Sequence, residues 1–286
     1  MKKILARLCV FFIGFPLCIA VVALLPQKNH LAANLLVTAL SALGAMEFSA
    51  ILAKKGLMVH KIEAFFYGLL PPAAFTAAVS LGQHYNIIWG VIMALAVWIM
   101  ARGFWTRVNA LDELTGRVAG SFAVLFYPSI FISWIILLNR FSGSTFILCF
   151  FISVVVITDS LGWVFGVLFG AGNRGIIPVS PNKSIAGYAG SFTGALAISL
   201  AAGRFFAAEF EASRFPHYGT ALILGLGTAI VSQAGDLAES AIKRSAGVKD
   251  SGEVMPGRGG ILDSIDSLAF AAPFFYFCFR ALCGAF

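Results

Sequence analysis

Long apolar runs separated by short polar segments dominate this chain. Nine runs have about the length that crosses a hydrocarbon core, which takes roughly 17–25 helical residues. They fall at residues 4–25, 31–53, 63–81, 86–101, 118–138, 144–169, 185–202, 215–235 and 261–282. A bilayer offers no water to backbone groups, so such runs predict helices. We therefore expect an all-α polytopic integral membrane protein with about nine transmembrane helices.

Two of these runs carry further signals. Pro71 and Pro72 lie inside the third run, where they predict a kink. The first run follows Lys2, Lys3 and Arg7, as a signal peptide would, but it is long and lacks a clear cleavage site. We expect this run to stay in the protein as an uncleaved anchor.

Composition and charge support the membrane assignment. The chain is 59% hydrophobic and 12% charged, with a mean hydropathy of +0.91, which excludes an ordinary soluble globule. If the N-terminus is cytoplasmic, fifteen Lys and Arg residues fall in inside segments and five fall outside. This asymmetry predicts a cytoplasmic N-terminus and an outside C-terminus.

The first polar element is Asp159, near the end of the sixth run. A carboxylate in or beside hydrocarbon usually faces a polar cavity or a partner; the alternative is an acid at a helix end in the interface. Gly162, Gly166 and Gly170 follow at four-residue spacing, which predicts close packing between helices.

The second polar element is the segment Ile177–Ser184, which precedes a glycine-rich helix. Ser180 and Ser184 offer hydroxyls, and Lys183 stands at the expected helix start. Free backbone N–H groups and the helix dipole at such a start attract phosphate, and an ammonium group strengthens the attraction. The alternative is a solvated lysine at the membrane flank.

The third polar element runs from Gln233 to Asp266 and interleaves carboxylates with cations. A helix from Asp236 places four further polar residues on one side: Glu239, Ser240, Lys243 and Arg244. Lys249-Asp250, a breaker at Pro256-Gly257 and a flexible Gly259-Gly260 pair lead to a new helix with Asp263 and Asp266 on one face. Such a set suits a hard divalent cation that bridges to phosphate oxygens. The alternative is a solvated loop with surface ion pairs.

The stretch from Ser240 to Asp266 resembles the phosphatidate cytidylyltransferase (CDP-diacylglycerol synthase) family, whose pattern is S-x-φ-K-R-x4-K-D-x-G-x3-P-x-H-G-G-φ-x-D-R-φ-D with φ apolar. The matching positions are Ser240, Lys243, Arg244, Lys249, Asp250, Gly252, Pro256, Gly259, Gly260, Asp263 and Asp266. The Gln233–Ser240 segment, the Ser180–Ser184 loop and Asp159 with its glycines also look like motifs of that family. The resemblance covers roughly residues 155–270.

The chain departs from the family pattern at four positions. Arg258 stands where the family has His, and Ser264 where it has Arg. Asn182 and Ser184 replace the common Lys and Thr. Because Arg binds phosphate through two nitrogens, which neutral His cannot do, we expect Arg258 to take over a phosphate contact.

The resemblance implies transfer of a cytidylyl group from CTP to phosphatidic acid, giving CDP-diacylglycerol and pyrophosphate, with Mg²⁺ at paired aspartates and a second cation left open. The catalytic residues would be Asp236, Asp263, Lys183 and Lys243. Metal ligands would be Asp236, Asp263, Asp266 and Asp159. Substrate contacts would come from Ser180, Ser240, Arg244, Lys249, Asp250 and Arg258.

The partners expected are CTP, phosphatidic acid and membrane lipids, without nucleic acid; a homodimer is left open. Residues 1–140 would form the N-terminal transmembrane helices, about five spans with weak resemblance to the family. Residues 141–286 would form the C-terminal catalytic transmembrane region with cytoplasmic motif loops. The location would be a bacterial-type inner (cytoplasmic) membrane, with the active site on its cytoplasmic side.

Three alternatives stay open at this point. The chain could be an archaetidate-type cytidylyltransferase, a CTP-dependent polyprenol kinase, or an inactive or transport-type lipid-binding relative. Glu47 is the one clear mid-span acid outside the motifs, and we expect it to pair with Lys54 or Lys55. Close contacts through Gly187, Gly190 and Gly194 could be internal or between subunits.

Overall fold

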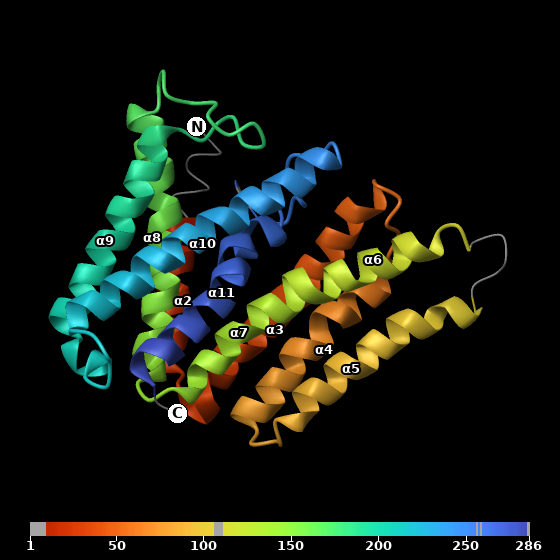
Figure 1. The fold of residues 1–286 in the computed structure, drawn as a ribbon, viewed down its shortest axis with the longest axis horizontal. Coiled ribbons are helices and arrows are strands. Elements are labelled where there is room, and N and C mark those ends of the chain that lie inside the picture. The colour runs from red at the N-terminus through yellow and green to blue at the C-terminus, as the bar shows by residue number, and fades with distance from the viewer. Residues whose placement is uncertain (1–9, 106–110, 256, 258, 285–286) are drawn as a thin grey trace.

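All long elements of the fold are helices (Figure 1). A computed structural model describes residues 10–105, 111–255, 257 and 259–284 of the chain. The α-helices are α2 (Phe15–Leu24), α3 (Gln27–Ala53), α4 (Lys61–Ser80), α5 (Asn86–Ala101), α6 (Leu114–Leu125), α7 (Ile132–Leu137), α8 (Ser144–Phe169), α9 (Ile185–Phe205), α10 (His217–Ser245) and α11 (Leu262–Cys283).

Eight helical segments of the described ranges are long and apolar enough to cross a membrane. One of them, Leu114–Arg140, joins α6 and α7 through a π-helical turn at Phe126–Phe131. The first predicted run contains a shorter apolar helix, Phe11–Leu24. Every predicted run therefore contains a helix, and the prediction of an all-α polytopic membrane protein is confirmed.

The helices that carry the polar motifs lie next to one another. In Figure 1, α10 and α11 run side by side, α8 pairs with α9, and α4 and α5 lie on the opposite side of the molecule. The segment between α8 and α9 lies at the same upper edge of the view as the last turns of α10. Motifs far apart in the sequence are thus brought to one end of the helices.

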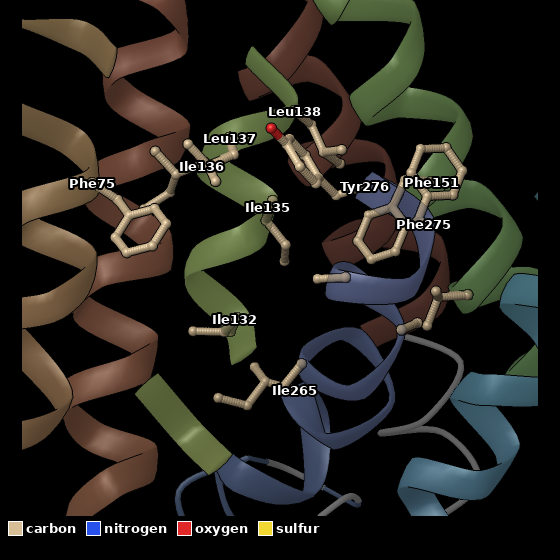
Figure 2. Packing of buried hydrophobic residues seen from close by; sticks show 14 of the residues in the cluster. Phe75, Ile132, Ile135, Ile136, Leu137, Leu138, Phe151, Ile265, Phe275 and Tyr276 are labelled. Carbon is tan, nitrogen blue, oxygen red and sulfur yellow. The ribbon is translucent and has the colours of Figure 1, made fainter. Parts of the chain in front are cut away.

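The core lies where α7 passes between α4 and α11. Ile132, Ile135 and Ile136 of α7 are at most 6% exposed, and Figure 2 shows them between the helices on either side. Phe275 of α11 packs against Phe151 of α8, with ring centroids 5.1 Å apart and the ring planes tilted by 56°. Aromatic pairs at this separation add to the free energy gained by packing. This packing holds α11, and hence its first turn, in place.

Pro71 and Pro72 lie inside α4 without interrupting it. A proline lacks the N–H that would bond four residues back, so Pro72 leaves the carbonyl of Gly68 without its helical donor. The hydroxyl of Ser41 in α3 lies 2.7 Å from that carbonyl oxygen and also 2.7 Å from Pro128 O, so its one proton is shared between the two oxygens. A neighbouring helix therefore satisfies the freed group, as membrane helices require.

The glycines of α8 and α9 form a close contact inside the chain. A Cβ added at Gly162 would lie 2.3 Å from Ser191 Oγ, and one at Gly190 would lie 2.5 Å from Phe165 Cβ. The predicted close packing at the four-residue glycine spacing is confirmed. Gly187 and Gly194 also face α8, so these contacts are internal to the chain.

We expect Gly190→Ala to lower the thermal stability of the purified protein. The added methyl group would meet Phe165 and the carbonyl oxygen of Leu161 at 2.6 Å, and overpacking of this kind costs about 1–3 kcal/mol. Gly90→Ala is the matched control, because nothing lies within 4 Å of its Cβ position. Thermal unfolding in detergent should show a lower midpoint for Gly190→Ala only, and equal midpoints would contradict the contact.

Candidate active site

A cavity of about 860 Å³ has one charged part and one apolar part. Side chains of α2, α3 and α8 line the apolar part, among them Phe15, Val37, Leu40, Ile152 and Val156. The charged part contains eight of the predicted site residues: Asp159, Lys183, Asp236, Lys243, Lys249, Asp250, Asp263 and Asp266. The structure thus gathers most of the predicted site around a single space.

Lys183, in the α8–α9 segment, contacts one of the cavity's aspartates. Its Nζ lies 2.7 Å from Asp236 Oδ2 and donates to Gln233 Oε1 at 3.1 Å. The same ammonium lies 5.5 Å from the centre of the Tyr188 ring, within the range of a cation–π contact. Lys183 is therefore held by α10 and by the start of α9 at once.

Gln233 connects three of these elements. Its Nε2 lies 3.4 Å from Asp159 Oδ1 of α8 and 3.4 Å from Ser191 Oγ of α9, while its Oε1 accepts from Lys183. The residue is buried in α10, one turn before Asp236. Its amide can donate and accept at the same time, so it fixes both Lys183 and Asp159.

Lys243 stands between two carboxylates in a buried position. Its Nζ makes ion pairs with Glu239, one turn earlier on α10, and with Asp263 at the start of α11. Lys243 is 7% exposed and Glu239 is 1% exposed. Because charges removed from water must be compensated, this triad depends on all three members. It also ties α10 to α11.

Asp263 also accepts hydrogen bonds from the segment just before α11. Its Oδ2 accepts from Ser251 N at 2.8 Å, from Gly260 N at 2.7 Å and from Ser251 Oγ at 2.9 Å. With Oδ2 saturated in this way, Oδ1 is the oxygen that meets Lys243. In the Asp263 carboxylate, hydrogen bonds from Ser251 and Gly260 therefore anchor Oδ2, and Oδ1 contacts the ammonium group of Lys243.

The Gly259-Gly260 pair is packed closely against polar side chains in the structure. Gly259 has φ +110°, a conformation that residues with a side chain rarely adopt. A Cβ at Gly259 would lie 2.5 Å from Asp263 Oδ2, and one at Gly260 would lie 2.0 Å from Ser251 Oγ. Glycine is required here because polar side chains occupy the space that a Cβ would fill.

Asp266 is a buried carboxylate on the cavity wall. It is 6% exposed, and its Oδ1 accepts from the neighbouring Ser267 N at 2.6 Å. Asp236, Glu239 and Asp159 act on it as nearby negative charges. Buried carboxylates that face one another are stable only with cations or protons among them.

The carboxylates that line the cavity are oxygen donors of the kind that a hard metal ion takes. In residues 10–105, 111–255, 257 and 259–284, no three His, Cys, Asp or Glu side chains gather as a complete metal site. Mg²⁺, however, is commonly bound through one or two carboxylates plus substrate phosphates. Asp236 and Asp263 line one cavity, and each already holds an ammonium group there. The residues therefore fit Mg²⁺ in the company of phosphate oxygens.

Three predicted site residues lie elsewhere, and a fourth is not described. Ser180, Ser240 and Arg244 do not line the cavity. Arg244 is exposed and donates to Val248 O at 3.1 Å, whereas Ser240 Oγ lies 3.4 Å from Asp236 Oδ1. Arg258 lies outside the described residues. Ser240 can thus act only through Asp236, at the edge of the site.

The N–H groups at the start of α9 are not free, contrary to the phosphate-binding prediction. Ser184 Oγ accepts from Gly187 N at 3.0 Å, and Asn173 O accepts from Ile185 N at 3.1 Å. Ala186 N lies 3.5 Å from Asn173 Oδ1. A helix start satisfied by its own chain offers little to an anion. At this helix start, the ammonium group of Lys183 is therefore the group that would attract phosphate.

Glu47 was predicted to pair with Lys54 or Lys55, and this was wrong. Among the described residues no ion pair joins Glu47 to either lysine. Its carboxylate instead accepts from Ser251 Oγ, Ile261 N and Leu262 N at 2.8, 3.0 and 2.9 Å. The acid stood out in the sequence, but its partners lie more than 200 residues away.

Taken together, the fold and the cavity define a polytopic helical membrane protein with paired lysines and aspartates beside an apolar chamber. The chain belongs to the cytidylyltransferase family, whose model matches residues 5–282. The match extends through the N-terminal helices, beyond the stretch that carries the motifs.

Individual relatives match over a shorter stretch. The phosphatidate cytidylyltransferase of Staphylococcus aureus (strain COL) is 40% identical over 136 residues, 47% of this chain and 49% of that protein. The phosphatidate cytidylyltransferase of Thermotoga maritima is 36% identical over 174 residues, 60% of this chain and 63% of that protein. The uncharacterized protein YnbB of Escherichia coli is 34% identical over 154 residues, 53% of this chain and 49% of that protein. The chain spans about half the length of most of these relatives.

Proposed function

We propose that the chain transfers the cytidylyl group of CTP to phosphatidic acid, giving CDP-diacylglycerol and pyrophosphate, at the cytoplasmic face of the membrane. The observation that carries this proposal is the single cavity with lysines and aspartates in one part and apolar side chains in the other. A nucleoside triphosphate needs the charged part, and the acyl chains of a phospholipid need the apolar part. The names of the relatives from S. aureus and T. maritima agree with this reaction.

The chemistry requires positioning and charge neutralisation. The phosphomonoester of phosphatidate has a second pKa near 6, so it is largely dianionic at neutral pH. One of its oxygens attacks the α-phosphorus of CTP, the bond from that phosphorus to the bridging oxygen breaks, and pyrophosphate leaves with the electron pair. No proton has to be removed from the nucleophile. Lys183, Lys243 and Lys249 line the space where these phosphates would meet and would stabilise the charge.

Asp236 and Asp263 would hold Mg²⁺ together with phosphate oxygens, and Asp266 and Asp159 would complete the acidic wall. When bound, the ion would neutralise phosphate charge that three lysines cannot offset alone. Lys183 and Lys243 now hold these aspartates and would be released to the substrates' phosphates. Gln233 would keep Lys183 in reach throughout, since it donates to Asp159 and Ser191 from the same amide.

The proposal is tested with purified protein, CTP, phosphatidate and Mg²⁺ in mixed micelles. We expect CDP-diacylglycerol and pyrophosphate in equal amounts, and no product when a chelator removes Mg²⁺. Asp236→Asn removes the charge that Lys183 contacts and should lower kcat about 100- to 1,000-fold. Asp112→Asn, at an exposed acid, is the matched control and should keep wild-type kcat.

The products separate the other candidates. A lipid that gains one phosphate without CMP identifies a CTP-dependent kinase. Turnover with an archaetidate-type ether lipid but not with phosphatidate identifies the archaetidate enzyme. If wild-type protein makes no lipid product from any of these substrates, the proposed function is wrong.

A further inference from the structure

Glu47 is an acid of α3 whose hydrogen bonds all reach the start of α11 and the turn before it. Oε1 accepts from Ile261 N at 3.0 Å, and Oε2 accepts from Leu262 N at 2.9 Å and from Ser251 Oγ at 2.8 Å. These partners lie 204 to 215 residues further along the chain. A single half-buried side chain therefore joins the N-terminal helices to the motif segment.

Two of these bonds satisfy backbone N–H groups at the start of α11. The first N–H groups of a helix have no partner within the helix, and the positive end of the helix dipole favours a carboxylate there. Ile261 and Leu262 occupy this position, and no carboxylate of α11 itself accepts from their N–H groups. Glu47 thus caps α11 from a different helix.

The third bond leads to Asp263. Ser251 Oγ lies 2.8 Å from Glu47 Oε2 and 2.9 Å from Asp263 Oδ2, so one hydroxyl stands between the two carboxylates. A hydroxyl has a single proton to donate, and it is shared between these oxygens. The position of Asp263 Oδ2 therefore depends on the position of the Glu47 carboxylate, because both oxygens bond the same hydroxyl.

The glycines around Glu47 leave room for this contact. A Cβ at Gly252 would lie 2.5 Å from Glu47 Oε1, and one at Gly260 would lie 2.2 Å from Glu47 Oε2. Both glycines belong to the segment that matches the family pattern. Their lack of a side chain lets the carboxylate reach the backbone N–H groups directly.

We propose that Glu47 is a positioning residue of the transfer site, an inference that rests on the proposed function. By fixing the start of α11 and sharing Ser251 with Asp263, it holds Asp263 Oδ2 and turns Oδ1 toward Lys243. It touches no substrate in this role. A displacement of about 1 Å at such a site can cost about 100-fold in rate, so the effect should appear in kcat.

The test compares Glu47→Gln with Glu113→Gln, the same chemical change at an exposed acid whose one ion pair within the described residues is with Arg117. Glutamine keeps the shape of glutamate but turns one acceptor oxygen into a donor, which opposes Leu262 N–H or Ile261 N–H. We expect Glu47→Gln to lower kcat about 10- to 100-fold while KM for CTP changes less than about threefold. Hydrogen exchange should become faster at residues 259–264 and stay unchanged in α5.

Ser251 separates positioning from a purely structural cap. If Glu47 acts through Ser251, then Glu47→Gln/Ser251→Ala should lose no more kcat than the larger of the two single variants. Additive losses mean that Glu47 and Ser251 act independently and overturn the part of the positioning role that runs through the shared hydroxyl. Ser251→Thr, which keeps the hydroxyl, should retain more kcat than Ser251→Ala.

The outcomes for the two proposals differ. If wild-type protein makes CDP-diacylglycerol and Glu47→Gln keeps kcat within twofold, the positioning role is overturned and the function stands. If wild-type protein makes no CDP-lipid, the proposed function is wrong. Hydrogen exchange then tests the contact between α3 and α11 by itself. Faster exchange at residues 259–264 in Glu47→Gln then supports the tie between α3 and α11, and unchanged exchange overturns it.

Discussion

Lys243→Met should lower kcat for lipid transfer about 100- to 1,000-fold and destabilise the protein. Lys243 is the one side chain that contacts both Glu239 and Asp263 in the described residues, and all three are largely buried. Methionine fills a similar volume but leaves two carboxylates facing each other without a cation. Removal of one partner from a buried ion pair costs about 3–5 kcal/mol, because the remaining charge stays buried and uncompensated.

The loss in activity should exceed the loss in folded protein. Lys243 also lines the cavity where the phosphates would lie, and removal of one preorganised charge of this kind lowers kcat about 100- to 1,000-fold. The measurements are kcat per folded protein at low temperature and the thermal midpoint in detergent. Lys54→Met, at an exposed lysine, is the control and should change neither quantity.

Lys243→Arg refines this result. Arginine keeps the charge but adds a planar group that needs more space, so we expect stability near wild type and a kcat that remains reduced. A Lys243→Met protein with wild-type kcat would show that the triad only joins α10 to α11. Wild-type stability with no turnover would instead show that Glu239 and Asp263 find another cation.

The apolar pattern was sufficient to predict the helices. A membrane imposes a minimum span length and forbids unpaired backbone groups, so hydropathy alone locates nearly every helix. Within α10, the helical repeat correctly placed Glu239 and Lys243 one turn apart on one side, whereas Arg244, predicted on that same side, is exposed and does not line the cavity. Local periodicity carries this information directly.

Contacts between distant segments could not be predicted in the same way. Nothing near Glu47 in the sequence points to Ser251 or to the start of α11, since that pairing arises from how α3 packs against α11. Gly260 illustrates the same limit. The sequence does not indicate which side chains occupy the space beside a glycine, and only the structure shows this. Gln233 matched the family's motif, but its role as a link between α8, α9 and α10 required the fold.

Gly260→Ala should lower kcat about 100-fold, because the place of Asp263 depends on Gly260 having no side chain. An added Cβ would lie 2.0 Å from Ser251 Oγ and 2.2 Å from Glu47 Oε2, and both atoms belong to the hydrogen bonds that hold Asp263. Neither can move away without losing an accepted or donated bond. We expect a stability loss of about 1–3 kcal/mol, as for other overpacked sites.

The result can be separated from a general intolerance of alanine. Gly219→Ala is the control, because its nearest neighbour, Phe215 Cβ, would lie at an ordinary contact distance of 3.8 Å. It should keep wild-type kcat and stability. Ser251→Ala in the Gly260→Ala background removes the closer of the two clashing atoms, so it should restore part of the lost stability but not the lost kcat. Full activity in Gly260→Ala alone would mean that Asp263 reaches Lys243 without the anchored oxygen, and the arrangement around Glu47 would then be dispensable for transfer.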